Sequence, residues 1–196
     1  MAGIELNSVF LSASVPLEER DPIYFHTADV VAIRDAVRAL ASVVAPRATL
    51  VWGGHPSINP LIKYVMERLD ANVQDHVKLF LSNFFQKYFP PEIASFGDIT
   101  YVPENVDRES SLHEMRVRMI GSRPFKAGIF IGGMEGVEVE YEYFRQRHPT
   151  AKVFPIASTG AAAKIIYQRM ETRPDVRLET DYAYLALFEA LLQDLV

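Results

Sequence analysis

The chain has 196 residues, 20 Lys and Arg against 25 Asp and Glu, a net charge of −5 and no cysteine. This length suits one domain with a sizeable core, so we expect residues 1–196 to form a single domain. The missing cysteines exclude disulfides, thiolate metal sites and a cysteine nucleophile, and the mildly negative charge gives no reason to expect nucleic acid as a partner.

Short apolar runs along the chain predict β-strands. They occupy residues 9–13, 49–52, 77–81, 99–102, 127–131 and 152–157. Most are apolar at nearly every position instead of alternating, which is typical of strands buried on both faces of a parallel sheet. Pro155 lacks the N–H that a strand ladder needs, so it indicates a sheet edge or a strand end.

Between these runs, apolar residues recur at the three- and four-residue steps of amphipathic helices. Val30, Ile33, Val37, Leu40 and Val44 share one face in this way. The same spacing predicts helices around residues 60–69, over 109–120, after Gly132-Gly133, over 161–170 and over 182–196. Alternating strands and helices predict an α/β fold, a Rossmann-like doubly wound, mostly parallel sheet with helices on both faces.

Small or glycine-rich turns follow four of the predicted strands. Ligands of such folds bind at the carboxyl ends of the strands, where glycine lets backbone N–H groups come close and helix N-termini favour anions. We therefore predict a nucleotide-like ligand at these turns; plain tight turns are the alternative. The candidate binding residues are Ser12 and Ser14, then Gly53, Gly54 and His55, then Gly132, Gly133, Met134 and Glu135, and finally Ser158, Thr159 and Gly160.

The charges of these turns predict how the ligand lies. The turns at 53–57 and 158–160 contain no acidic residue, so we expect phosphate at one of them. The helix after Gly133 begins with Glu135, Glu138 and further glutamates, which repel phosphate but accept hydrogen bonds from ribose hydroxyls. Ordinary solvation of a helix N-terminus is the alternative for any one of these glutamates.

Common signatures of cofactor and catalytic sites are missing from the sequence. It contains no GxGxxG, no GxxxxGK[ST] and no GxSxG, and its histidines lack HExxH spacing, so we expect neither a cofactor nor a metal site. The longest apolar helical stretch, 30–45, is interrupted by Arg34, Asp35 and Arg38, and residues 1–7 lack the basic region of a leader. We therefore predict a cytoplasmic protein with no membrane partner.

Three of the strand-end motifs are informative together. They are Phe10-Leu11-Ser12-Ala13-Ser14-Val15-Pro16, Gly53-Gly54-His55, and Gly132-Gly133-Met134-Glu135-Gly136 before an acidic helix. These motifs resemble the SLOG superfamily, whose name joins the Smf/DprA proteins and the LOG (lonely guy) phosphoribohydrolases. The resemblance extends over residues 9–170. It implies a Rossmann-like domain that binds a nucleotide or nucleotide-derived ligand and forms homo-oligomers, and several members are regarded as sensors in bacterial defence systems.

LOG enzymes cleave the base–ribose bond of nucleoside monophosphates and carry a PGGxGTxxE motif and an upstream helical arginine. By this resemblance Arg116 is the arginine, and Glu138, or alternatively Glu140, is the glutamate. A glutamate there could stabilise an oxocarbenium-like ribose or activate water, while the arginine could hold phosphate or the leaving group. The chain departs from the motif, since Glu135-Gly136 replaces Gly-Thr and Val139 takes the gap-free position of the glutamate.

These observations leave three interpretations. The first is a sensor that binds a nucleotide-derived ligand without turnover, favoured because the Gly-Thr pair is missing. The second is a nucleotide N-glycosidase, and the third is an oligomeric interaction scaffold with an empty pocket. Arg116 could instead be a surface residue paired with Glu109 or Glu114. The aromatic residues between Phe84 and Tyr101 predict core filling or a dimer contact, with stacking on a base as the alternative.

Overall fold

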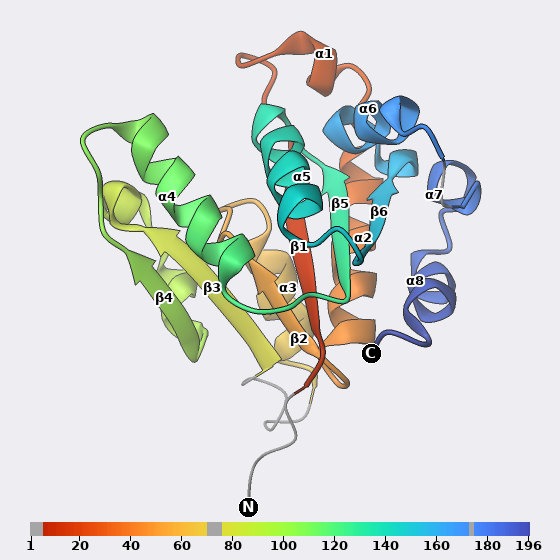
Figure 1. Ribbon diagram of the computed structural model, residues 1–196, viewed down its shortest axis with the longest axis horizontal. Helices are drawn as coiled ribbons and strands as arrows, with labels where there is room; N and C mark the ends of the chain where they lie inside the picture. Colours follow the sequence, from red (N-terminus) through yellow and green to blue (C-terminus); the bar gives the residue numbers. More distant parts are fainter. Residues whose placement is uncertain (1–5, 70–75, 173–174) are drawn as a thin grey trace, which may run out of the picture.

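The computed structural model describes residues 6–69, 76–172 and 175–196 (Figure 1). Residues 1–5, on which the expectation of no leader partly rests, lie outside these ranges. Within the ranges, six strands form one sheet in the order β4-β3-β2-β1-β5-β6, and every neighbouring pair is parallel. The strands are β1 (Ser8–Ser14), β2 (Thr49–Trp52), β3 (Val77–Ser82), β4 (Asp98–Val102), β5 (Ala127–Gly132) and β6 (Lys152–Ile156).

This arrangement confirms the predicted Rossmann-like α/β fold. Pro155 lies in β6, which is an edge strand, as its missing N–H indicates. The longer helices also follow the predicted pattern, whereas the short helical turns were not predicted. The helices are α1 (Pro22–Phe25), α2 (Val30–Val44), α3 (Asn59–Met66), α4 (Arg108–Gly121), α5 (Glu135–Arg147), α6 (Ala161–Arg169), α7 (Arg177–Thr180) and α8 (Tyr184–Leu192), with 3₁₀ turns η2 (Asn83–Tyr88), η3 (Pro91–Ser95) and η4 (Ala157–Thr159).

The helices form two layers, one on each face of the sheet (Figure 1). Val9 and Leu11 of β1 pack into the core that includes α2, α3 and α8, while Phe10 between them packs into the core of α4, α5 and α6. Successive residues of a strand point to opposite faces, so a strand covered on both sides must be apolar throughout. That requirement is why continuous apolar runs, not alternating ones, mark the strands of this sequence.

Side-chain caps mark the starts of helices α2 and α4, among others. The Asp29 carboxylate accepts the Ala32 N–H at 2.9 Å and starts α2. Asp107 and Ser110 form a reciprocal capping box at the start of α4. Each such cap stabilises a helix by about 1 kcal/mol. The α4 cap fixes the start of a helix that contributes an arginine to the cavity described below.

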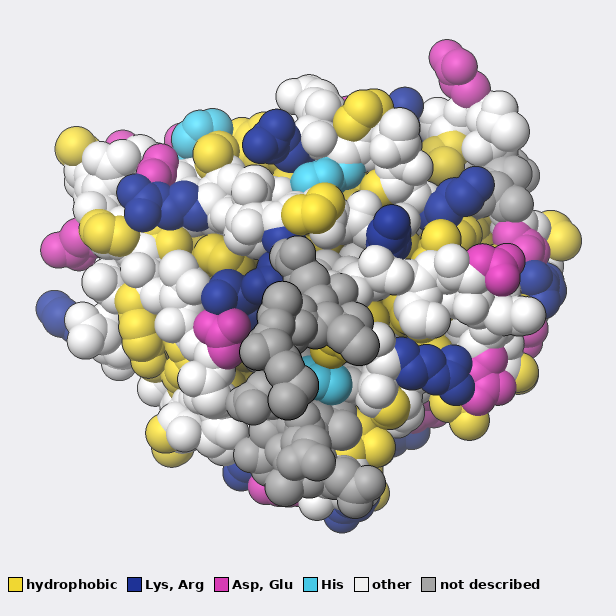
Figure 2. Space-filling view, turned by 60° about the horizontal axis from the view of Figure 1, so that its bottom comes forward, with side chains coloured by type: hydrophobic (Ala, Val, Ile, Leu, Met, Phe, Trp, Pro, Cys, Tyr) yellow, Lys and Arg dark blue, Asp and Glu magenta, His cyan; other side chains and the backbone are white. Residues whose placement is uncertain are grey.

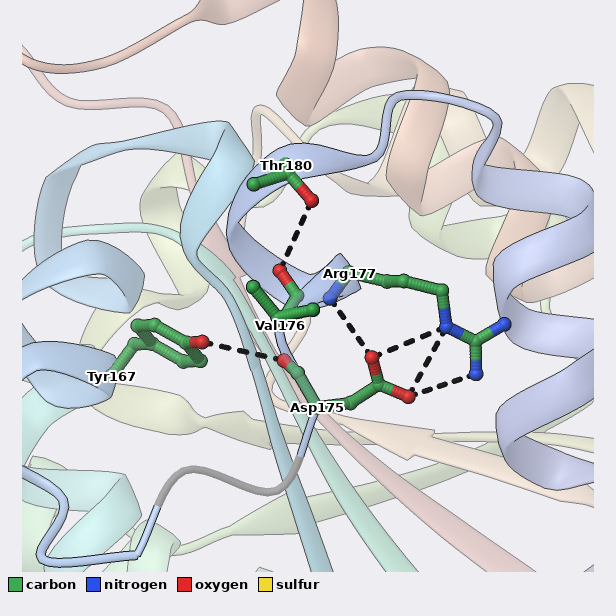
Figure 3. A network of polar contacts seen from close by, with 5 residues as sticks. All are labelled: Tyr167, Asp175, Val176, Arg177 and Thr180. Carbon is green, nitrogen blue, oxygen red and sulfur yellow. Dashed lines mark hydrogen bonds and ion pairs between the residues drawn. The ribbon is translucent and has the colours of Figure 1, made fainter.

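The chain between α6 and α8 is tied by a small polar network (Figure 3). Arg177 pairs with both carboxylate oxygens of Asp175, the closest approach being 2.8 Å from Nη2 to Oδ2, and this pairing lowers the pKa of Asp175. The Tyr167 hydroxyl donates to the Asp175 carbonyl oxygen at 3.4 Å. Helix α8 then packs its buried Leu187 and Phe188 against the core around α2.

No helix of the described residues is both long and apolar enough to cross a membrane. Figure 2 brings the lower part of Figure 1 forward, and on that face Lys and Arg side chains lie interspersed with Asp and Glu. The charged groups visible there form no broad field of one sign.

Candidate functional site

A cavity of about 570 Å³ lies at the carboxyl ends of β1, β2 and β3, between α4 and the first turns of α5. Strand β1 stands between β2 and β5. The chain leaves β1 toward β2 on one side and leaves β5 toward β6 on the other, so the loops diverge and open a crevice at this switch point. The cavity therefore sits where a doubly wound fold normally binds its ligand.

Three of the four predicted turns contribute to this cavity, together with the helical arginine. Gly132 and Gly133 shape the β5–α5 turn with positive φ angles of +54° and +85°. A Cβ at Gly132 would lie 2.4 Å from the Ile33 side chain, and one at Gly133 would lie 2.2 Å from Val137. The predicted residues that line the cavity are Ser12, Ser14, Gly53, Gly54, His55, Arg116, Met134 and Glu135.

The polar centre of the cavity joins Arg116, Glu140 and Ser12. Arg116 Nε lies 3.2 Å from Glu140 Oε1, and the Ser12 hydroxyl donates to Glu140 Oε2 at 2.5 Å. The Arg116 and Glu140 side chains are only 16% and 14% exposed, so solvent screens this ion pair less than a surface pair. A Cβ at Gly136 would stand 2.9 Å from Arg116 Nη2, so the glycine leaves room for the guanidinium.

Of the two glutamates named from the motif, Glu140 lines the cavity and Glu138 does not. Glu140 follows Gly136 by one helical turn and shares its face, whereas Glu138 is two residues away and points elsewhere. The Glu138 carboxylate instead accepts the Tyr24 hydroxyl at 2.6 Å and pairs with Arg169. The alternative interpretation, in which Arg116 pairs on its own helix with Glu109 or Glu114, does not apply, since Arg116 pairs with Glu140.

The fourth predicted turn, residues 158–160, does not line the cavity. The Thr159 hydroxyl accepts the Gly132 N–H at 2.9 Å and donates to the Ile156 carbonyl oxygen at 2.6 Å. The Ala161 N–H donates to Thr27 Oγ1, and a Cβ at Gly160 would lie 1.7 Å from the Thr27 carbonyl oxygen. The start of α6 is thus covered by the chain itself, which favours the other predicted phosphate position, the 53–57 loop.

The covering chain is the strap, residues 15–29, which joins β1 to α2 and includes α1. Tyr24 fastens it to α5 through Glu138, and burial together with this carboxylate raises the pKa of the Tyr24 hydroxyl. Arg20 pairs with Glu135 at the start of α5, and both residues line the cavity. The strap therefore uses Glu138 as a structural anchor and adds a cation to the cavity.

The 53–57 loop is held rigidly beside the cavity. The Asn59 side chain accepts the Trp52 indole N–H at 3.0 Å and donates to the Gly54 carbonyl oxygen at 2.8 Å. Gly54 has a φ of +63°, and a Cβ there would lie 2.2 Å from the Leu81 side chain. His55 Nδ1 lies 2.8 Å from Ser57 Oγ; burial, aided by the positive charge of Arg20, lowers the pKa of His55 from 6.5 to about 4. The imidazole is therefore neutral at pH 7.

Some of the aromatic residues between Phe84 and Tyr101 lie in the core and others line the cavity. Phe96 is buried and packs edge-on against Trp52, with ring centroids 5.3 Å apart, as core filling predicts. Phe85, Tyr88 and Phe89, in and just after η2, line the cavity instead. They give one end of it an apolar wall suited to a flat ring.

Arg20 and Arg108 are not among the site residues predicted from the sequence. Both line the cavity, whereas Arg118 pairs with Glu114 on the surface of α4. Arg20 lies in the strap, a mostly irregular segment whose sequence has no periodicity from which the orientation of the side chain could be predicted. Among the described residues, no three His, Asp or Glu side chains are grouped so that they could hold a metal ion.

Comparisons with known proteins agree with this fold. The X-ray structure of TM1055, a Northeast Structural Genomics Consortium target, superposes with a TM-score of 0.57 over 88% of this chain and 89% of that one, at 14% sequence identity. At that identity the likeness concerns the fold alone. A search of curated proteins finds no match. A family model described as the SLOG cluster3 family matches residues 23–192, nearly the whole chain, and the protein therefore belongs to this family.

Proposed function

We propose that this protein binds a nucleotide-derived ligand in the cavity and acts as a ligand sensor without turnover. The observation that carries the proposal is the convergence of the turns after β1, β2 and β5 on one cavity of about 570 Å³ at the switch point of the sheet. A cavity of this size accommodates a ligand of nucleotide size. Membership of the SLOG cluster3 family supports the same ligand class.

The polar groups suggest an orientation for the ligand. The α5 side carries Glu140 and Glu135, whose carboxylates accept hydrogen bonds from sugar hydroxyls. The 53–57 loop has no acidic residue and supplies backbone N–H groups at two glycines, so it suits phosphate. We place the sugar beside Glu140, the phosphate at this loop and the base toward the aromatic wall. As further proposals, the single domain acts in the cytoplasm as a homo-oligomer.

A second candidate function is N-glycosidic cleavage of a nucleotide, favoured by the ion pair of Arg116 and Glu140 in the cavity. A carboxylate beside the sugar could stabilise the positive charge that develops on ribose or orient an attacking water. The missing Gly-Thr of the LOG motif argues against turnover, since the structure has Glu135-Gly136 there instead.

Thermal-shift screening tests the binding proposal. The panel contains nucleoside monophosphates, cyclic nucleotides, NAD and ADP-ribose, each with its phosphate-free nucleoside as control. A ligand at 100 times its dissociation constant stabilises the fold by about 2.7 kcal/mol, which raises the melting temperature of a protein of this size by several degrees. If no compound of this class shifts the transition, the binding proposal fails and the scaffold interpretation gains support.

Release of free base then separates sensor from enzyme. The sensor proposal predicts no release from any bound nucleotide. Release that disappears in Glu140→Ala but persists in Glu142→Ala establishes the enzymatic function. Glu142→Ala is the matched control because it removes an exposed carboxylate from the same helix outside the cavity.

A further inference from the structure

We infer that His55 is a specificity-determining residue, fixed as a neutral imidazole with its proton on Nε2, which it donates to a phosphoryl oxygen of the ligand. This inference rests on the proposed function, because it assigns one contact of the same cavity. The tautomer itself follows from the protein alone.

The hydrogen-bond directions around Nδ1 determine the tautomer. The backbone N–H of Ser57 points at Nδ1, with an N–N distance of 3.3 Å, and a backbone N–H can only donate. Ser57 Oγ lies 2.8 Å from Nδ1 and accepts the backbone N–H of Val15 at 3.1 Å, so its own proton is free to point at Nδ1 as well. Nδ1 is therefore an acceptor, and the proton of the neutral ring must reside on Nε2.

Nε2 is the nitrogen that remains for a ligand. His55 lines the cavity, and within residues 6–69, 76–172 and 175–196 no hydrogen-bond partner is found for Nε2. A protonated nitrogen needs an acceptor when the cavity is filled and desolvated, because an unmet donor in a closed site costs free energy. A ligand that presents an oxygen at this point gains that bond, and one that presents a donor is excluded.

The surroundings favour a phosphoryl oxygen as that acceptor. The loop that carries His55 contains no acidic side chain, and Arg20 stands close enough to lower the affinity of the ring for a proton. Glu135, whose carboxylate also lines the cavity, is paired with Arg20. The remaining charged groups of the cavity are Arg116 with Glu140, paired with each other, and Arg108 and Glu109 of α4. A neutral imidazole N–H next to an arginine can donate to an anion, and the ring does not need a positive charge of its own.

Nitrogen NMR of the whole ligand-free protein tests the tautomer. In a long-range ¹H–¹⁵N spectrum, with the His55 signals assigned by their loss in His55→Gln, we expect a protonated Nε2 and an unprotonated Nδ1. This pattern should persist down to about pH 5.5, where a free histidine is mostly protonated. A proton on Nδ1, a mixture of tautomers, or an imidazolium near neutral pH would overturn the inference, whatever the protein binds.

Binding of AMP and ADP-ribose, each compared with adenosine, tests the phosphoryl contact. Loss of a hydrogen bond to a charged oxygen lowers affinity about tenfold or more, so His55→Leu should lose this much for the phosphorylated probes and little for adenosine. His55→Gln places an amide N–H near the position of Nε2 and should restore most of the affinity. Melting curves establish that both variants are folded.

The outcomes are distinguishable. Unchanged affinity of His55→Leu for AMP and ADP-ribose overturns the contact while the proposed function stands. Equal losses for adenosine and the phosphorylated probes also overturn it, since they indicate a structural effect of the ring. If neither nucleotide binds the wild-type protein, the proposed function and the phosphoryl contact fail together, and the NMR result alone decides the tautomer.

Discussion

Replacing Glu140 by Gln removes the negative charge of the ion pair in the cavity while keeping the shape of the side chain. The paired nitrogen and oxygen are 3.2 Å apart, and both side chains are largely buried. Exposed ion pairs contribute about 0–1 kcal/mol, whereas breaking a fully buried pair costs about 3–5 kcal/mol. A pair with these exposures lies between the two, so we expect Glu140→Gln to destabilise the fold by about 2 kcal/mol.

A double-mutant cycle in urea isolates the pair. Glu140→Gln, Arg116→Gln and the double variant should show a coupling energy above about 1 kcal/mol. The pair of Glu114 and Arg118 is a matched control on the same helix, with side chains 38% and 53% exposed. Its coupling should stay below about 0.5 kcal/mol, as for exposed pairs one helical turn apart.

Two results would refute this reasoning. Coupling between Arg116 and Glu140 no larger than that of the control pair would mean that the cavity is solvated like the surface. A stabilising effect of Glu140→Gln would mean that the carboxylate is strained by its surroundings instead of paired by them. Either result removes the charged centre on which the proposed sugar contact depends.

The remaining predictions concern pH, backbone geometry and the strap. The pKa of His55 is about 4 in the fold against 6.5 in the unfolded chain, so the unfolded state binds more protons between these values. The contribution of His55 to the free energy of unfolding should be complete above pH 6.5 and should fall by on the order of 3 kcal/mol as the pH drops to 4. Urea unfolding measured over this pH range should show the loss in the wild type, and His55→Gln should lack this part of the pH dependence. Gly54→Ala should lower the free energy of unfolding by about 1–3 kcal/mol, because its Cβ would lie 2.2 Å from Leu81 Cδ2 at a positive φ. In Gly53→Ala the Cβ would lie 3.4 Å from its nearest neighbour, so this control should change the melting temperature little. Tyr24→Phe should cost about 1 kcal/mol and speed amide exchange across residues 15–29, and unchanged exchange there would mean that Tyr24 does not hold the strap.

The strands could be predicted because the signal that marks each of them lies in its own consecutive residues. A strand buried on both faces needs apolar residues at every position, and β5, for example, is buried throughout. The short helices α1 and α7 escape such reasoning because four residues carry no periodicity. They depend on long-range contacts, such as the bond from Tyr24 to Glu138 for α1 and the burial of Leu178 for α7.

The candidate site could be predicted only in part. The turns after β1, β2 and β5 follow from the general rule for parallel sheets, but nothing local shows that the strap covers the turn after β6. Helical spacing could have distinguished Glu140 from Glu138, because only Glu140 lies on the same helix face as Gly136. Motif spacing alone misses this, since the chain has one residue more than the motif between the glycines and the glutamate.

A crystal structure of the protein with bound ADP-ribose tests the central claim most directly. The account predicts electron density for the ligand in the cavity, with a phosphoryl oxygen within hydrogen-bond distance of His55 Nε2 and a sugar hydroxyl on the Glu140 carboxylate. Density at the start of α6, or a phosphate seated on Glu140 with the sugar at the 53–57 loop, would contradict it.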